Sequence, residues 1–165
     1  MEKASSLSRK WQIVVFFLTA LAVLASDQLS KAWIRSHLAI GESLPETGWI
    51  RLTYVRNTGS SFGLFQNQFL PLTVVAVAGA IVLVYLALLG YRRFPFLDKV
   101  SSQITLGLVL GGTLGNLVDR LRFGYITDFI DFGFWPAFNV ADSAIVIGVA
   151  AFAYLLLSLV RAEKH

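Results

Sequence analysis

The stretch Gly107-Leu-Val-Leu-Gly-Gly-Thr-Leu-Gly-Asn116-Leu-Val-Asp119-Arg120 joins an apolar segment to a polar end. Three of its glycines are four residues apart and share one helix face, where small residues let a neighbouring helix approach closely. Asn116 and Asp119 are three apart and project from one side of the last turn. Polar groups near hydrocarbon are costly without partners, so we expect a functional polar cluster here. An Asp119–Arg120 pair that only reaches the membrane interface is the alternative.

The composition of the chain indicates an integral membrane protein. Of its 165 residues, 56% are hydrophobic and only 15% are charged, with a mean hydropathy of +0.66. A soluble domain carries about 25% charged residues. There is no cysteine, which excludes disulfides, thiol catalysis and thiolate metal sites. The pI of about 9.6 is explained by basic residues beside membrane spans, so we expect no nucleic-acid partner.

Long apolar segments occur four times, and each is close to the roughly 20 residues that a helix needs to cross a bilayer. The first is expected to be a retained helix, because it ends in Ser26-Asp27-Gln28 and not in a signal-peptide cleavage site. We therefore predict an all-α membrane protein with four transmembrane helices, forming a single domain over residues 1–165. The predicted helices cover approximately residues 11–33, 69–89, 100–121 and 138–160.

Two longer connections, residues 36–68 and 121–137, are expected to form a small β-rich segment outside the membrane. Residues 49–55 alternate and are rich in strand formers, which predicts a strand. Residues 126–132 resemble a short strand or a re-entrant segment. Residues 61–65 could be a second strand or an interfacial helix.

The distribution of lysine and arginine predicts the orientation of the chain. Basic residues are concentrated in the N-terminal tail, in the short turn over residues 90–99 and in the C-terminal tail. The positive-inside rule places these parts in the cytoplasm, by a modest margin. Four aspartates then fall together toward the outer face: Asp27, Asp119, Asp128 and Asp142.

Paired carboxylates suggest acid–base catalysis, because two carboxyl groups that meet can share one proton and activate a water molecule. Asp142 lies a turn inside the fourth span, three residues after Asn139, which could simply cap that helix. Asp128 competes with Asp131, and either could be a carboxylate in a wet loop. There is no His-Glu-x-x-His motif, and His37 and His165 lie outside the predicted spans, so we expect no metal and no cofactor.

Five boxes in order resemble those of the bacterial lipoprotein signal peptidases, the signal peptidase II family, over nearly the whole chain. The resemblance implies a catalytic dyad of Asp128 and Asp142. It also implies polar supporting residues at Asn57, Asn116, Arg120 and Asn139, with Asp27 and Asp119 bracing the site. The boxes are Asp27-Gln-Leu-Ser-Lys31, Asn57-Thr-Gly-x-x-Phe62, Gly111-Gly-x-x-Gly-Asn-x-x-Asp-Arg120, Thr127-Asp-Phe-Ile130 and Phe138-Asn-x-Ala-Asp-Ser143.

The family resemblance implies an aspartyl endopeptidase of the inner membrane. Its substrates would be prolipoproteins whose lipobox cysteine carries diacylglycerol, cut just before that cysteine. Membrane lipids and globomycin-type inhibitors would be its other partners. Two alternatives remain from the residues themselves. A small proton-coupled transporter also places aspartates in helices, but usually shows repeated halves. A non-enzymatic scaffold explains the apolar spans but not the four carboxylates.

Overall fold

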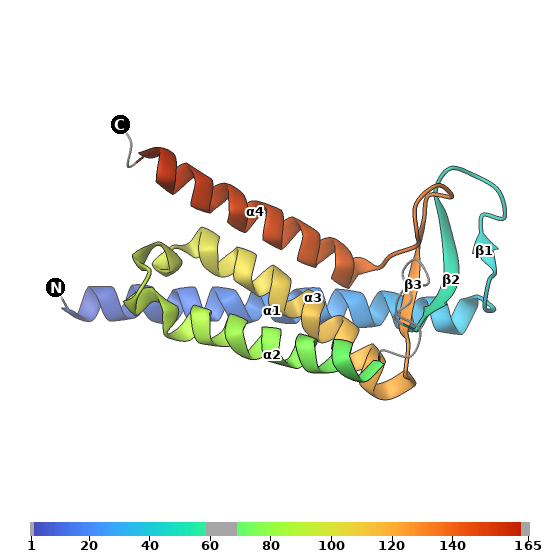
Figure 1. Cartoon of the computed structure of the whole chain (residues 1–165), viewed down its shortest axis with the longest axis horizontal. Helices are drawn as coiled ribbons and strands as arrows, with labels where there is room; N and C mark the ends of the chain where they lie inside the picture. The colour runs from blue at the N-terminus through green and yellow to red at the C-terminus, as the bar shows by residue number, and fades with distance from the viewer. Residues whose placement is uncertain (1, 59–68, 163–165) are drawn as a thin grey trace.

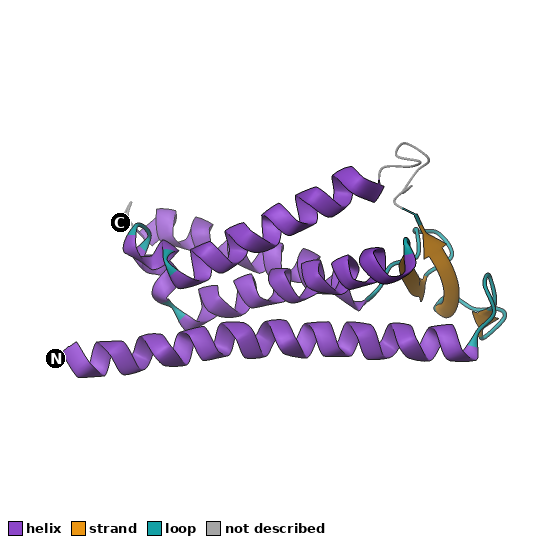
Figure 2. Ribbon diagram, turned by 90° about the horizontal axis from the view of Figure 1, so that it is seen from below, coloured by secondary structure: helices purple, strands orange, loops and turns teal. Residues whose placement is uncertain are grey.

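The computed structural model describes residues 2–58 and 69–162, and the side chains of residues 9–58 and 70–161. Four helices lie roughly side by side, and a small sheet covers one end of the bundle (Figures 1 and 2). Helix α1 begins and helix α4 ends at the opposite end (Figure 1). The elements in chain order are α1 (Glu2–His37), β1 (Ser43–Leu44), β2 (Arg51–Asn57), α2 (Phe69–Leu88), η2 (Gly90–Arg92), η3 (Pro95–Asp98), α3 (Val100–Phe123), β3 (Ile126–Asp131) and α4 (Val140–Ala162).

Three of these helices are long and apolar enough to cross a membrane, namely α1, α2 and α4. Helix α3 has 24 residues, which is roughly 36 Å, and runs beside the others (Figure 1). Its glycines and polar residues lower its hydropathy, and it contacts each of the other three helices. The predicted fold class, a helical membrane protein with a small β segment, is confirmed. The observed α1 is longer than predicted and ends at His37, so this histidine belongs to the helix.

Gly107, Gly111 and Gly115 form a glycine seam on one face of α3 that meets a neighbouring helix, as their spacing predicts, and this helix is α1. A Cβ atom added at Gly111 would lie 2.6 Å from the carbonyl oxygen of Ala20 and 2.7 Å from the Cβ atom of Val23. Gly107 lies against Thr19 in the same way. The next glycine, Gly112, is on a different face and meets α4. The two helix backbones therefore approach α3 at distances that only glycine permits.

The sheet is antiparallel with the strand order β1-β2-β3. Strand β2 lies two residues later than predicted, while β3 confirms the strand interpretation of residues 126–132. The pairing shifts between Leu52 and Val55, after which Val55 lies opposite Asp128. One face of the sheet packs on α1, where Tyr54 and Phe129 join Ile34 and Leu38 in a buried cluster. Residues 61–65 are outside the part of the chain that the structure describes.

Helix α3 ends because Gly124 adopts a left-handed conformation, with φ of 76°, and its N–H donates to the carbonyl of Arg120. This conformation suits glycine, which has no Cβ atom to clash. The chain reverses there and enters β3 at Ile126. The turn therefore places β3 beside the polar end of α3.

We predict that Gly111→Ala destabilises the protein, whereas Gly79→Ala does not. Overpacking of a close helix contact costs about 1–3 kcal/mol. Gly79 lies inside α2 with nothing within 4 Å of an added Cβ atom. Alanine there should be neutral or add up to ~1 kcal/mol through its helix propensity. Thermal unfolding of the two variants in one detergent measures the difference, and equal midpoints would contradict the close packing.

Candidate functional site

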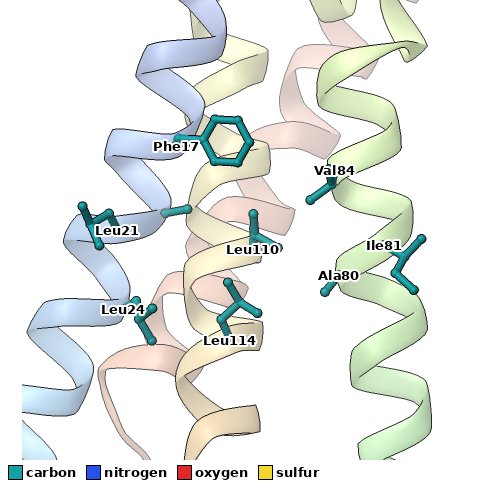
Figure 3. A pocket seen from close by; sticks show the side chains of 9 residues that line it. Phe17, Leu21, Leu24, Ala80, Ile81, Val84, Leu110 and Leu114 are labelled. Carbon is teal, nitrogen blue, oxygen red and sulfur yellow. The ribbon is translucent and has the colours of Figure 1, made fainter.

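Two cavities in the bundle differ in chemistry. The first, of about 480 Å³, lies between α1, α2 and α3, and only apolar side chains line it (Figure 3). Leu21, Ile81 and Leu110 are typical of its walls. The second, of about 760 Å³, lies at the sheet end and contains both Asp128 and Asp142. A third cavity, of about 560 Å³, contains Asp142 but not Asp128. The second cavity holds both carboxylates, so it is the candidate site.

The two carboxylates reach this cavity from different elements. Asp128 is on β3 and is 2% exposed, and Asp142 is in the first turn of α4. Asn139 precedes α4, and its Oδ1 accepts a hydrogen bond from the backbone N–H of Asp142 at 2.9 Å. The helix-cap interpretation of Asn139 is therefore confirmed. The cap fixes the start of α4 and thereby the position of Asp142.

Asn139 also connects the carboxylates. Its Nδ2 donates to Asp128 Oδ1 at 2.7 Å and to Asn116 Oδ1 at 3.2 Å. The Nδ2 of Asn116 in turn donates to Asp142 Oδ1 at 2.7 Å. Two asparagines thus form a bridge, defined here as the asparagine bridge, from one carboxylate to the other. Asn57 holds the other oxygen of Asp128, with Nδ2 at 2.9 Å.

A fully buried ion cluster lies beneath this bridge. Lys31 Nζ is 2.8 Å from Asp27 Oδ2 and 3.4 Å from Asp119 Oδ2, and all three side chains are inaccessible to solvent. The ammonium also donates to Asn116 Oδ1 at 2.9 Å. Lys31 therefore links the charged cluster to the asparagine bridge. Two carboxylates around one buried cation leave a local negative charge, which hydrogen bonds must offset.

Those hydrogen bonds come from the backbone beside each cavity carboxylate. Asp27 Oδ1 accepts from the N–H of Ala141 at 2.9 Å, and Asp119 Oδ2 accepts from the N–H of Thr127 at 2.8 Å. Ala141 directly precedes Asp142, and Thr127 directly precedes Asp128. The two bracing aspartates therefore each hold the backbone next to one carboxylate of the site.

Lys31 belongs to the buried cluster of the candidate site, although it was not among the site residues predicted from the sequence. It ends one of the motif boxes. Its signal was its position four residues after Asp27, which places both side chains on the same face of α1. Arg35, one further turn along, reaches Asp119 Oδ1 at 3.5 Å. A repeated spacing of four between acidic and basic side chains inside a span would have identified the cluster.

Arg120 lies in the last turn of α3, half-buried, and lines the cavity with the two carboxylates. Among the residues that the structure describes, no carboxylate lies within 4.0 Å of its guanidinium. Five N–H donors thus remain available to a bound molecule. The interpretation of Arg120 as half of an Asp119–Arg120 ion pair is therefore wrong, since Lys31 and Arg35 take that place.

Asp131 is outside the cavity and has a structural role. Its Oδ2 accepts hydrogen bonds from Arg51 Nη2 at 2.6 Å and from Thr53 Oγ1 at 2.9 Å. The backbone N–H of Gly133 donates to Oδ1 at 2.7 Å, and this bond is the main reason that the pKa of Asp131 is lowered. The carboxylate fastens β3 to β2, so Asp128 and not Asp131 is the aspartate of this segment that faces the cavity.

Burial changes the acidity of Asp128. Removal from water, opposed by the hydrogen bond from Asn57 and reinforced by the negative charge of Asp142, raises the pKa of Asp128 from 3.8 to about 7. A carboxyl group with this pKa exchanges its proton near neutrality. The site therefore contains a group suited to acid–base chemistry under ordinary conditions.

The bundle with its polar cavity has the architecture of a membrane-embedded enzyme, and two solved structures share the fold. Both are described as bacterial membrane enzymes determined by the in meso method. The first has a TM-score of 0.77 at 30% identity and covers 87% of this chain and 87% of its own. The second has a TM-score of 0.76 at 30% identity, with coverages of 86% and 92%.

The sequence comparisons give the family. Residues 19–158 match the family model of signal peptidase (SPase) II. The lipoprotein signal peptidase of Moorella thermoacetica is 48% identical over 143 residues, which are 86% of this chain and 92% of that protein. The lipoprotein signal peptidase of Dehalococcoides mccartyi is 42% identical over 144 residues, which are 87% of this chain and 89% of that protein. The chain belongs to the signal peptidase II family, which confirms the resemblance and makes it a peptidase in place of a transporter or a scaffold.

The raised pKa of Asp128 predicts how stability depends on pH. Because the folded protein holds this proton up to about pH 7 and the unfolded chain releases it near 3.8, stability is highest below about pH 4 and falls as the pH rises to 7. The loss amounts to ~4 kcal/mol at most. Asp128→Asn removes the titration, so its stability relative to the parent should increase over this range. Thermal unfolding between pH 4 and 8 measures it, and a constant difference would argue against the shift.

Proposed function

We propose that this protein is an aspartyl endopeptidase that removes the signal peptide from diacylglyceryl-modified prolipoproteins. The observation that carries the proposal is that Asp128 and Asp142, from different elements, line one cavity and are joined by the asparagine bridge. Two carboxyl groups in such an arrangement can hold one proton between them, as aspartic proteases require. Family membership supports the peptidase chemistry.

The proposed reaction uses the different protonation of the two groups. In this proposal Asp128, whose pKa is raised to about 7, carries the shared proton near neutral pH, and Asp142 acts as the base. Asp142 takes a proton from a water between them, and this water attacks the scissile carbonyl. Asp128 donates its hydrogen bond to the carbonyl oxygen and stabilises the charge that develops there. Transfer of a proton to the leaving amine then breaks the C–N bond and restores the dyad.

The remaining walls of the cavity suit a substrate that is part peptide and part lipid. Arg120 presents donors to the backbone carbonyls of a bound peptide, and Asn57 beside it holds Asp128 in position. On the other side, Leu72, Val146 and Ile147 provide an apolar wall that opens toward the membrane-facing surface. A diacylglyceryl cysteine would place its acyl chains along this wall. The peptide bond just before that cysteine would then lie at the dyad.

We further propose that the protein lies in the bacterial cytoplasmic membrane with both ends of the chain in the cytoplasm. The start of α1, the end of α4 and the α2–α3 connection share one end of the bundle, and the sheet is at the other (Figure 1). Asp128 on β3 and Asp142 in the first turn of α4 belong to the sheet end. The greater density of basic residues at the first end supports its cytoplasmic placement. The dyad would then meet exported lipoproteins at the outer face.

The dyad assignment predicts that Asp128→Asn and Asp142→Asn each abolish cleavage, with a loss of at least about 10³-fold, because an amide cannot serve as base or acid. Asp131→Asn is the matched control, since it changes a neighbouring carboxylate that fastens the sheet. It should retain activity. Cleavage of a lipidated prolipoprotein by the purified, folded variants is the measurement. An active Asp128→Asn with an inactive Asp131→Asn would show that the wrong aspartate was chosen.

The apolar wall predicts that the substrate must be lipidated. One prolipoprotein, compared before and after transfer of diacylglycerol to its cysteine, should be cleaved only in the second form. Globomycin should block that cleavage by occupying the dyad. Equal rates for the two substrate forms would contradict the proposed position of the acyl chains, while leaving the dyad in place.

The proposed orientation predicts which residues are accessible from outside the cell. Thr47 and Ser101 are both exposed, at the sheet end and at the other end respectively. The native chain has no cysteine, so single cysteines at these positions can be labelled without background. A membrane-impermeant thiol reagent added to intact cells should label Thr47→Cys and spare Ser101→Cys. The reverse pattern would invert the protein and place the dyad in the cytoplasm.

A further inference from the structure

A second cluster of charged side chains lies outside the cavity, where α3 turns into β3. The rings of Phe123 and Tyr125 are 5.9 Å apart, and arginines lie over both. The Cζ atoms of Arg35 and Arg122 are 4.5 and 5.3 Å from the centre of the Phe123 ring. That of Arg56 is 4.7 Å from the centre of the Tyr125 ring. We refer to these five residues as the arginine–aromatic cluster.

The arginine–aromatic cluster is on the opposite side of β3 from the dyad. Successive side chains of a strand point to opposite faces. The hydroxyl of Thr127 accepts a hydrogen bond from Arg35 at 2.9 Å, on the side of α1. The next residue, Asp128, instead contacts Asn57 and Asn139 in the cavity. Changes to Arg56 and Arg122 can therefore be tested separately from catalysis.

Within the described residues, two of the three guanidinium groups have no carboxylate within 4.0 Å. Arg35 pairs with Asp119 at 3.5 Å. Arg56 is exposed, and its Nε donates to the hydroxyl of Tyr54 at 3.3 Å, a neutral group. Arg122 is exposed, and in the described part of the chain no carboxylate lies within 4.0 Å of it or of Arg56. The cluster thus presents two unneutralised positive charges on an aromatic surface.

The position of these charges indicates their counter-ion. Arg122 and Phe123 end a helix of the membrane bundle, and aromatic rings at such ends suit the interface between lipid and water. Leu121, beside Arg122, is 65% exposed, which adds an apolar surface next to the charge. Guanidinium groups bind phosphate through two parallel hydrogen bonds. A phosphate attached to acyl chains would meet both the charges and the apolar surface.

We propose that the arginine–aromatic cluster binds the phosphate of an anionic phospholipid in the leaflet next to the sheet. The lipid phosphate lies between Arg56 and Arg122, with its acyl chains directed toward Leu121 and the membrane. The bound lipid neutralises cations that the bracing aspartates do not reach. It also anchors the junction of α3 and β3, which carries Asp128 on its other face.

The test is native mass spectrometry of the full-length protein in detergent, titrated with phosphatidylglycerol or phosphatidylcholine. We expect tighter binding of phosphatidylglycerol. In R56Q/R122Q its affinity should fall by about fivefold for each arginine removed, while the weak affinity for phosphatidylcholine stays the same. The matched control is R92Q/R93Q, which removes two exposed arginines at the opposite end of the bundle and should retain the affinity.

Other outcomes would overturn the proposal. These are equal affinity for both lipids, equal effects of the two double variants, or displacement of phosphatidylglycerol by inorganic phosphate at the same concentration. The single variant Arg122→Gln serves as a second test in case the double variant misfolds. Among the described residues, the only contact that the structure gives this side chain is with the Phe123 ring, so its replacement should not disturb folding. It should lower the affinity by about fivefold with an unchanged unfolding temperature. Binding is measured directly, so the result does not depend on the proposed peptidase mechanism.

Discussion

The buried ammonium group of Lys31 is the interaction on which the site depends. Its Nζ lies 2.8 Å from Asp27 Oδ2 and 3.4 Å from Asp119 Oδ2, and so offsets part of the charge of two side chains that have no solvent exposure. Each of these aspartates then holds the backbone N–H directly before one carboxylate of the cavity. Loss of one partner from such a buried pair costs roughly 3–5 kcal/mol, because the other charge is left uncompensated. One cation in α1 therefore fixes the positions of β3 and α4 together.

The glycine seam of α3 makes this cluster possible. A Cβ atom at Gly115 would lie 2.5 Å from Asp27 Oδ2, so the absence of a side chain there leaves room for the carboxylate. Gly112 allows α4 to approach until the backbone of Ala141 reaches Asp27 from the other side. Close helix packing and a buried ion cluster are thus one arrangement. The glycines bring the helices together, and the charges fix their register.

Much of the fold follows from local signals in the sequence. Apolar runs gave the helices to within a few residues at most ends, because a helix that crosses a bilayer must be long and apolar. Helix α1 extends further because its amphiphilic ends, including His37, continue the helix beyond the hydrocarbon. The predicted start of β2 was two residues too early, because alternation in the sequence does not reveal the shifted pairing between Leu52 and Val55. The sequence of α3 alone does not reveal which face of α1 packs against the glycine seam.

The candidate site, like the fold, could be predicted only in part from the sequence. The motif boxes identified the residues of the dyad and its supports, and the spacing of Asn139 and Asp142 predicted the helix cap. Which aspartate of β3 faces the cavity depends on the pairing of Asp131 with Arg51, a contact between residues 80 positions apart. Lys31 was overlooked because a lysine near a span end is usually exposed at the interface. Its contacts with Asp119 and Asn116 depend on the packing of α1 against α3, which forms only in the folded protein.

The protonation of the dyad is the most direct test of the proposed mechanism. Infrared spectroscopy of the folded protein with isotope-labelled aspartate can follow the protonated carboxyl group through a pH titration. We predict one protonated aspartate per molecule at pH 6, which loses its proton near pH 7, as the raised pKa of Asp128 requires. Its band should vanish when Asp128 is replaced by asparagine and persist when Asp131 is replaced. Full ionisation of every aspartate at pH 6 would contradict a shared proton, and with it the proposed aspartyl chemistry.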